Sequence, residues 1–106
     1  MARFYGGLLG WESTLTEPDW VLMRDPEGGV GLSFQLETDH VAPAWPAGPG
    51  DQAMQVHLDI RVDDLGEGVE RATAAGATLP EAQPQDDVRV LLDPAGHPFC
   101  LFAGTG

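Results

Sequence analysis

Hydrophobic and polar residues along this chain predict two groups of elements, separated by a stretch without periodicity. In the first group, apolar residues at helical spacing stop at Gly10, which predicts a short helix over residues 2–9. Strands are then predicted at residues 11–15, 20–24 and 30–36. The first group is therefore a helix followed by three strands.

The second group opens with a strand over residues 55–62 whose residues alternate between the two faces of a sheet. Leu58, Ile60 and Val62 form its apolar face, and His57, Asp59 and Arg61 lie on the other. Acidic residues where a helix dipole favours them, followed by Gly76, predict a helix from residue 65 to about residue 75. Further strands are predicted at residues 77–79, 88–92 and 98–102.

The connection between the groups, residues 38–54, is rich in proline and glycine and is predicted to be a linker. The two groups share a turn motif: Asp25-Pro26-Glu27-Gly28 recurs as Asp93-Pro94-Ala95-Gly96, each between two apolar runs. The chain is therefore interpreted as two copies of one unit. Only the second copy has a strand before its helix. Either the opening strand of the first copy lies outside this sequence, or the protein manages with seven strands, which leaves a sheet edge that another chain could pair with.

Composition narrows the possible functions. The chain has 106 residues, enough for one domain, and its net charge of −12 disfavours nucleic acid and anionic membranes as partners. A neutral or cationic small-molecule ligand suits this charge better. Lysine is absent, which excludes Schiff-base chemistry. The single cysteine, Cys100, excludes an intrachain disulfide, and no apolar run is long enough to span a membrane. A cytoplasmic location is expected.

Three segments carry a resemblance to a known superfamily: residues 2–11 (ARFYGGLLGW), 57–65 (HLDIRVDDL) and 92–99 (LDPAGHPF). In this order they resemble the vicinal oxygen chelate superfamily, the group of glyoxalase I, bleomycin resistance proteins and extradiol dioxygenases. The resemblance implies an α+β fold of tandem βαβββ units forming a curved mixed sheet, with the first strand of the first unit missing. It implies a single domain over residues 1–106, with units at 1–37 and 55–106 and the linker at 38–54. It also implies a homodimer.

The superfamily's enzymes hold a divalent metal with side chains from the first and last strands of both units. The resemblance places His57 at one such position, Cys100 at another, and Ser33 at the counterpart of Cys100 in the first unit. Gln35 shares a face with Ser33. Carboxylates are missing from both last strands, so the metal site is predicted to be incomplete. A divalent metal with His57 as a ligand stays possible; Asp59 could add a carboxylate, although the two need not converge on one ion.

Alternation along the strands predicts a concave face with an apolar lining and a few polar groups, the usual composition of a small-molecule site. Arg89 and Leu91 are expected to share this face with Cys100. The candidate ligand-binding residues are His57, Asp59, Arg61, Ser33, Gln35, Arg89, Cys100 and Phe102. Structural roles compete with these assignments: His57 as a hydrogen-bonded strand residue, Cys100 as a small buried side chain, and Trp11, Trp20 and Met23 as core.

Three functions remain open. The first is a small-molecule-binding protein of the bleomycin-resistance type that needs no metal. The second is a metal-dependent lyase or dioxygenase in which His57 is a metal ligand and Asp59 a general base. The third is a metal-free enzyme that uses His57 as acid or base, although no ordered nucleophile, base and orienting group can be assigned. The catalytic residues, if any, are not identified by the sequence.

Overall fold

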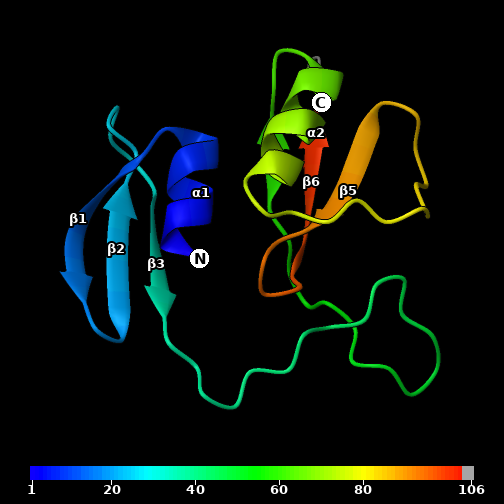
Figure 1. Ribbon diagram of the computed structural model, residues 1–106, viewed down its shortest axis with the longest axis horizontal. Coiled ribbons are helices and arrows are strands. Elements are labelled where there is room, and N and C mark those ends of the chain that lie inside the picture. Colours follow the sequence, from blue (N-terminus) through cyan, green and yellow to red (C-terminus); the bar gives the residue numbers. More distant parts are fainter. Residues whose placement is uncertain (104–106) are drawn as a thin grey trace. The chain divides into compact units, whose positions relative to one another are not determined.

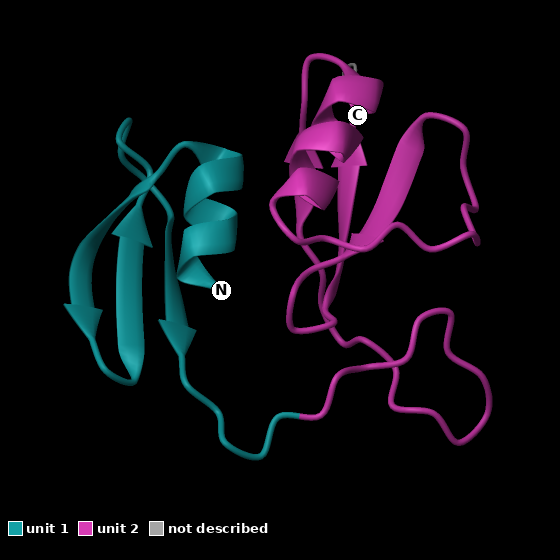
Figure 2. Cartoon of the chain, in the orientation of Figure 1, with its two compact units in different colours: residues 1–40 teal, residues 41–106 magenta. Residues whose placement is uncertain are grey.

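The structure, a computed structural model, describes residues 1–103 of the chain and divides it into two compact units, Met1–His40 and Val41–Gly106 (Figure 2). The first unit contains α1 (Ala2–Leu9), β1 (Glu12–Glu17), β2 (Trp20–Arg24) and β3 (Gly31–Gln35) (Figure 1). The second contains β4 (Asp59–Arg61), α2 (Leu65–Ala74), β5 (Val88–Leu92) and β6 (Pro98–Phe102). The predicted end of the second unit, residues 104–106, lies outside the described residues.

In the first unit, β1, β2 and β3 form an antiparallel sheet in that order, and α1 packs on one face of it. Gly10 ends α1 in the left-handed conformation, with φ of 72°, where glycine has no steric penalty. Met23 on β2 is fully buried, and the Tyr5 ring of α1 stacks on Phe34 of β3 with their centroids 5.8 Å apart. These contacts form the small core of the unit.

In the second unit the strand order is β4-β6-β5, with β4 parallel and β5 antiparallel to β6. Asp64 caps α2 by accepting a hydrogen bond from the Glu67 N–H at 2.9 Å. A β-carbon at Gly68 of α2 would lie 3.2 Å from Val62, so the helix and the end of β4 pack closely. The core under α2 consists of fully buried side chains, Leu91, Phe99 and Leu101, with Ala72 from the helix.

The prediction of an α+β fold made of two similar units is confirmed, and so are both helices. The strand predicted at 30–36 is one residue shorter at each end, and two other strands differ more from their prediction. The predicted strand at 55–62 is reduced to Asp59–Arg61, because the next backbone position of β6 that faces β4 is Pro98, which has no N–H to extend the ladder. The predicted strand at 77–79 is only a single bridge between Thr78 and Leu92. Among the described residues, no helix is both long and apolar enough to cross a membrane.

Residues 41–53 have no helix or strand, yet they make specific contacts within the second unit. The Gln52 side-chain amide donates a hydrogen bond to the Val41 carbonyl at 2.8 Å, and the Ala44 N–H donates to the Gln52 carbonyl at 2.8 Å. A β-carbon at Gly96 would lie only 2.6 Å from the Ala42 side chain. This part of the predicted linker is therefore held against the turn between β5 and β6.

The repeated motif forms the same turn in both units. In each copy the aspartate Oδ1 accepts the N–H two residues later: Glu27 for Asp25, at 2.9 Å, and Ala95 for Asp93, at 3.0 Å. Asp93 also accepts the His97 N–H at 2.9 Å and lies 3.0 Å from the His97 ring Nδ1. Asp93 is buried, whereas Asp25 is only partly buried. The two turns share a conformation, but the second depends more strongly on its carboxylate.

This difference predicts that replacing the aspartate of the turn lowers the free energy of unfolding more in the second unit than in the first. Asp93→Ala leaves two backbone N–H groups without their acceptor and is expected to lower the free energy of unfolding by about 2–4 kcal/mol. Asp25→Ala, the matched variant in the first unit, removes one such bond at a more exposed site and is expected to cost about 1 kcal/mol or less. Urea denaturation followed by circular dichroism measures both, and equal losses would contradict the interpretation.

Candidate functional site

The candidate site lies on the face of the second sheet opposite α2. Ile60 and Leu101 are register partners on the face under α2, so their neighbours along each strand face the other way. Asp59 pairs with Cys100, and Arg61 pairs with Phe102. The register between β4 and β6 therefore brings together, on one face, four of the side chains that the sequence assigned to a ligand site.

His57, Asp59 and Cys100 form the centre of this face. The His57 Nε2 lies 3.1 Å from the Asp59 Oδ1, and one ligand atom from each of the three residues lies within 4.8 Å of the others. The His57 side chain is 35% exposed and that of Asp59 is 60% exposed, so small molecules can reach both. The sequence left open whether His57 and Asp59 come together, and the structure brings them into contact: although His57 precedes β4, its ring nitrogen lies close to the Asp59 carboxylate.

The Cys100 thiol is strongly affected by these surroundings. Burial raises the pKa of Cys100 to about 11, and the Asp59 carboxylate adds to this shift through its charge and a hydrogen bond from the thiol. At neutral pH the group is therefore a protonated thiol that donates to Asp59, and it is a weak nucleophile. This result argues against Cys100 as a catalytic nucleophile.

Apolar side chains border the three polar groups. Val90 lies opposite Cys100 in the register of β5 and β6, Val88 lies opposite Phe102, and Leu92 lies opposite Pro98. Because cross-strand partners share a face, this row continues the candidate site onto β5. Val90 is buried, whereas Val88 and Phe102 are only half-buried. The site is thus a polar centre with an apolar margin.

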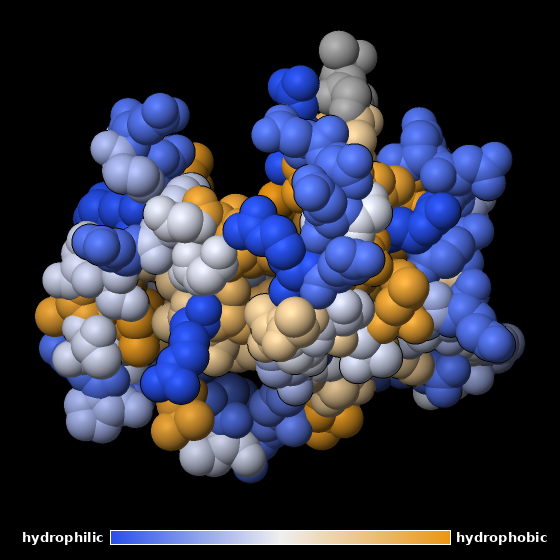
Figure 3. All heavy atoms as spheres, turned by 45° about the horizontal axis from the view of Figure 1, so that its top comes forward, coloured by the Kyte–Doolittle hydropathy of each residue, from blue (hydrophilic) through white to orange (hydrophobic). Residues whose placement is uncertain are grey.

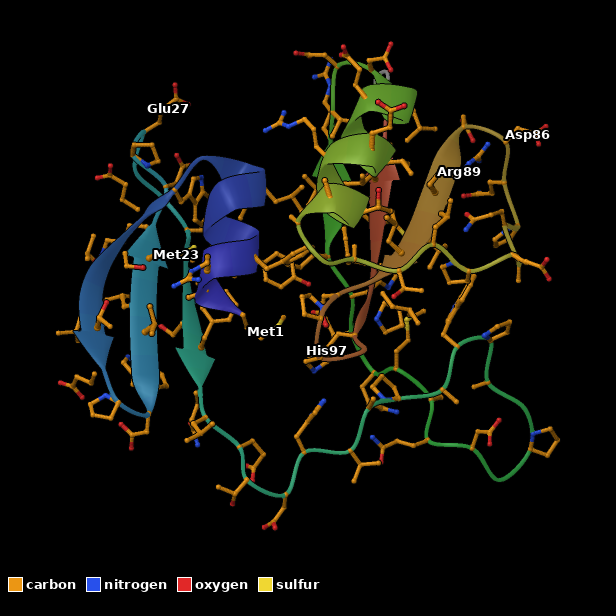
Figure 4. The ribbon with its side chains drawn as sticks, viewed as in Figure 1. Met1, Met23, Glu27, Asp86, Arg89 and His97 are labelled. Atoms are coloured by element: carbon orange, nitrogen blue, oxygen red, sulfur yellow. The ribbon has the colours of Figure 1, made fainter. Side chains whose placement is uncertain are left out.

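The prediction that Arg89 and Leu91 share this face is wrong. Arg89 pairs with Leu101 and Leu91 pairs with Phe99, which places both on the face under α2. The Arg89 guanidinium donates to the carbonyls of Gln85 and Asp86 at 3.0 and 3.1 Å, so it holds the loop before β5 (Figure 4). The sequence did contain a signal for the correct register. If Asp93 and His97 face each other across the turn, counting outward along both strands pairs Val90 with Cys100.

Ser33 and Gln35 belong to the first unit and are described separately. Both lie on the face of the first sheet opposite α1, are exposed, and pair with Leu22 and Trp20 of β2. Ser33 occupies the position in its hairpin that Cys100 occupies in the second, as predicted from the repeat. Met23, by contrast, is core. The face with Ser33 and Gln35 is neutral at these two positions and offers no carboxylate or imidazole there.

Among the described residues, the other two histidines are not members of this three-residue group. His97 follows the turn between β5 and β6, where Asp93 contacts its ring (Figure 4), and His40 lies at the end of the first unit. Hydrophilic residues cover much of the molecular face drawn in Figure 3, in keeping with the acidic composition. Hydrophilic residues are therefore widespread, and the distinguishing feature of the site is the convergence of three different functional groups.

The donor set of His57, Asp59 and Cys100 fits a borderline divalent metal such as zinc. Imidazole nitrogen, carboxylate oxygen and thiolate sulfur are all zinc ligands, and three protein ligands with one open position are typical of catalytic zinc. Cys100 would have to lose its proton to bind, which its raised pKa opposes in the absence of an ion. The residues present can hold a metal only by exchanging the hydrogen bonds described above for metal bonds.

Comparisons with known proteins agree with this architecture. The family model of the glyoxalase-like domain matches residues 1–102. No curated protein matches the chain. The chain is similar in structure to a glyoxalase-related enzyme from Fulvimarina pelagi, with a TM-score of 0.66 and 24% identity, covering 97% of this chain and 77% of that one.

Two resistance proteins are also similar in fold. A bleomycin resistance determinant encoded on transposon Tn5 has a TM-score of 0.56 at 18% identity, covering 99% of this chain and 87% of that one. The fosfomycin resistance protein FosX from Listeria monocytogenes, in complex with Mn(II) and sulfate, has a TM-score of 0.67 at 15% identity, covering 98% and 78%. At these identities the likeness shows a shared fold.

The surroundings of Cys100 predict its reactivity. Because its pKa is raised from 9.0 to about 11, alkylation by iodoacetamide at pH 8 should be at least about tenfold slower in the folded protein than in urea. Asp59→Asn removes the carboxylate charge and should restore part of the rate, whereas Asp63→Asn, outside the cluster, should not. Mass spectrometry of the modified protein over time measures the rates. Equal rates in folded and unfolded protein would contradict the assignment.

Proposed function

The chain belongs to the glyoxalase-like domain family of the vicinal oxygen chelate superfamily, and we propose that it binds a small molecule without a metal. In this proposal the ligand lies on the face of the second sheet opposite α2. His57, Asp59 and Cys100 contact its polar part, and Arg61 and Phe102 lie beside them. Ser33 and Gln35 are proposed as ligand contacts of the first unit on its own exposed face.

The observation that carries this proposal is that the Asp59 carboxylate contacts both of the other central groups. Asp59 lies 3.1 Å from the His57 ring nitrogen and also accepts the Cys100 thiol, so one carboxylate serves both neighbours. Polar groups that satisfy one another need no ion to compensate them. The set is therefore preorganised as a hydrogen-bonding surface, which is what recognition of a polar group on a ligand requires.

The chemistry of the face indicates the class of ligand. Asp59 is the accessible acidic group of the centre, and the whole chain carries a net charge of −12, so a cationic group on the ligand is favoured. Phe102 and Val88 offer apolar contact beside it. The proposed ligand is a small aromatic or heterocyclic compound with a positive charge. As part of the same proposal, the protein acts in the cytoplasm as a homodimer.

A second candidate function rests on the convergence of three possible metal ligands. His57, Asp59 and Cys100 would hold a divalent ion, and the ion would supply Lewis-acid chemistry to a substrate bound at its open position. This is the metal-dependent lyase or dioxygenase alternative. In it Asp59 has the role of a ligand, so it is no longer available as the general base.

The binding proposal predicts selective thermal stabilisation. A ligand present at a hundredfold excess over its Kd should raise the free energy of unfolding by about 2.7 kcal/mol. We expect stabilisation by cationic aromatic compounds and none by their neutral isosteres, measured by differential scanning fluorimetry in the presence of EDTA. Asp59→Asn should abolish the preference, and Asp86→Asn, on the loop before β5, should leave it intact. The absence of stabilisation across a broad panel would count against the proposal.

The metal alternative predicts stoichiometric binding. Titration with Zn²⁺, Ni²⁺, Fe²⁺ and Mn²⁺ in a calorimeter, together with metal analysis of the purified protein, tests it. If the alternative is right, one equivalent binds with release of the Cys100 proton, and His57→Ala or Cys100→Ser weakens binding by at least about tenfold. His40→Ala serves as the matched control. Tight binding that His57→Ala abolishes would overturn the metal-free proposal.

A further inference from the structure

Two neighbouring rows of side chains cross the second sheet on the face opposite α2. The first row consists of partners on β4, β6 and β5, namely Asp59, Cys100 and Val90. The second row consists of partners on the same three strands, namely Arg61, Phe102 and Val88. One row therefore carries a carboxylate and the next a guanidinium.

The backbone fixes the spacing of these two charged side chains. The Cys100 N–H donates to the Leu58 carbonyl and the Val62 N–H donates to the Phe102 carbonyl, both at 2.8 Å, so β4 is held against β6 at both of its ends. The carboxylate and the guanidinium belong to residues two apart in this strand, so their side chains begin about 7 Å from each other on the same face. A ligand that meets both side chains must extend across the two rows.

Arg61 is the arginine of this sheet that faces the candidate site. Arg89 on β5 pairs with Leu101 and so lies on the face under α2, and its guanidinium donates to carbonyls of the loop before β5. The three strands contain no further arginine, and the chain has no lysine. An anionic group on a ligand of this face therefore has Arg61 as its permanently charged partner.

The Arg61 guanidinium is available to such a group. In the described part of the chain Arg61 forms no ion pair, and Asp59, its neighbour on the same face, contacts His57 and Cys100 instead. Arg61 is also exposed. A planar guanidinium binds a carboxylate through two parallel hydrogen bonds, a geometry that an ammonium group does not offer. Arg61 is therefore suited to recognise a carboxylate.

The surface beside the two charged side chains is apolar. Phe102 lies next to Arg61 in the register, Val88 lies next to Phe102, and both apolar side chains are half-buried. A flat ring that carries the charged groups of a ligand can rest on such a surface. The face thus offers complementary contacts for a cationic group, a ring and an anionic group.

We propose that Arg61 selects an anionic group on the ligand, so that the ligand is a zwitterion: an aromatic ring with a cationic group for Asp59 and a carboxylate for Arg61. This inference rests on the proposed function, which places the ligand on this face and assigns its cationic group to Asp59. It adds a second charged group to the ligand and gives Arg61 a defined role. The net charge of −12 repels a carboxylate, so a preference for one has to come from a local partner.

Two compounds of the same shape test this inference with the full chain. They are para-(aminomethyl)benzoate, which carries both charges, and para-(aminomethyl)benzamide, which carries only the cationic one. Calorimetry in the presence of EDTA should show that the unmodified chain binds the carboxylate about tenfold or more tightly than the amide. Arg61→Gln should reverse this order, because the carboxylate then meets only the acidic field of the chain. Arg71→Gln, which removes an exposed arginine of α2, should preserve it.

Asp59→Asn separates a failure of this inference from a failure of the proposed function. In that variant both compounds should bind more weakly, while the carboxylate keeps its advantage over the amide. Equal affinities for the unmodified chain, or an advantage that survives in Arg61→Gln, would refute the role of Arg61 and leave the cationic site intact. Binding that Asp59→Asn does not weaken would contradict the proposed function instead, and an advantage that depends on Arg61 would still support the inference. Binding of neither compound would contradict both.

Discussion

The candidate site depends on one constraint, the strand register that the turn at Asp93 sets. The buried carboxylate holds the N–H groups of Ala95 and His97, which closes the hairpin with Asp93 opposite His97. From that pair onward, each residue of β5 has a defined partner on β6, and Cys100 falls on the face opposite α2. A slip of one residue would bury Cys100 under α2 and expose Leu101, so the turn selects the chemistry of the face.

The same turn operates in both units with different consequences. The first turn has one residue more between its aspartate and the following strand, yet Ser33 still takes the place of Cys100 in its hairpin. In the second unit that place is completed by β4, which brings Asp59 and His57 to it. Duplication supplied the scaffold twice, but the neighbouring strand supplies the titratable groups. The second unit therefore has a cluster of titratable groups because β4 pairs with β6 there.

Much of the fold could be predicted because it is encoded locally. Helix ends followed from Gly10 and the acidic start of α2, and the repeated turns followed from Asp-Pro-x-Gly. The lengths of two strands could not be predicted, since the ladder at β4 ends where Pro98 offers no N–H. Arg89 lies on the face under α2 because the register that starts at the Asp93 turn pairs it with Leu101, and alternation within one strand does not reveal that register. Its guanidinium instead stabilises the loop at Gln85 and Asp86.

By itself, the sequence determined the duplicated α+β fold, the superfamily and the list of polar side chains from which a site could be built. It did so because turns, caps and alternation act over a few residues. Only the tertiary structure decided which of these side chains meet. The proximity of Asp59 to Cys100, which contributes to the raised pKa of the thiol, arises from strands that are about forty residues apart in the chain but adjacent in the sheet. Such proximity depends on pairing and burial, which no local pattern specifies.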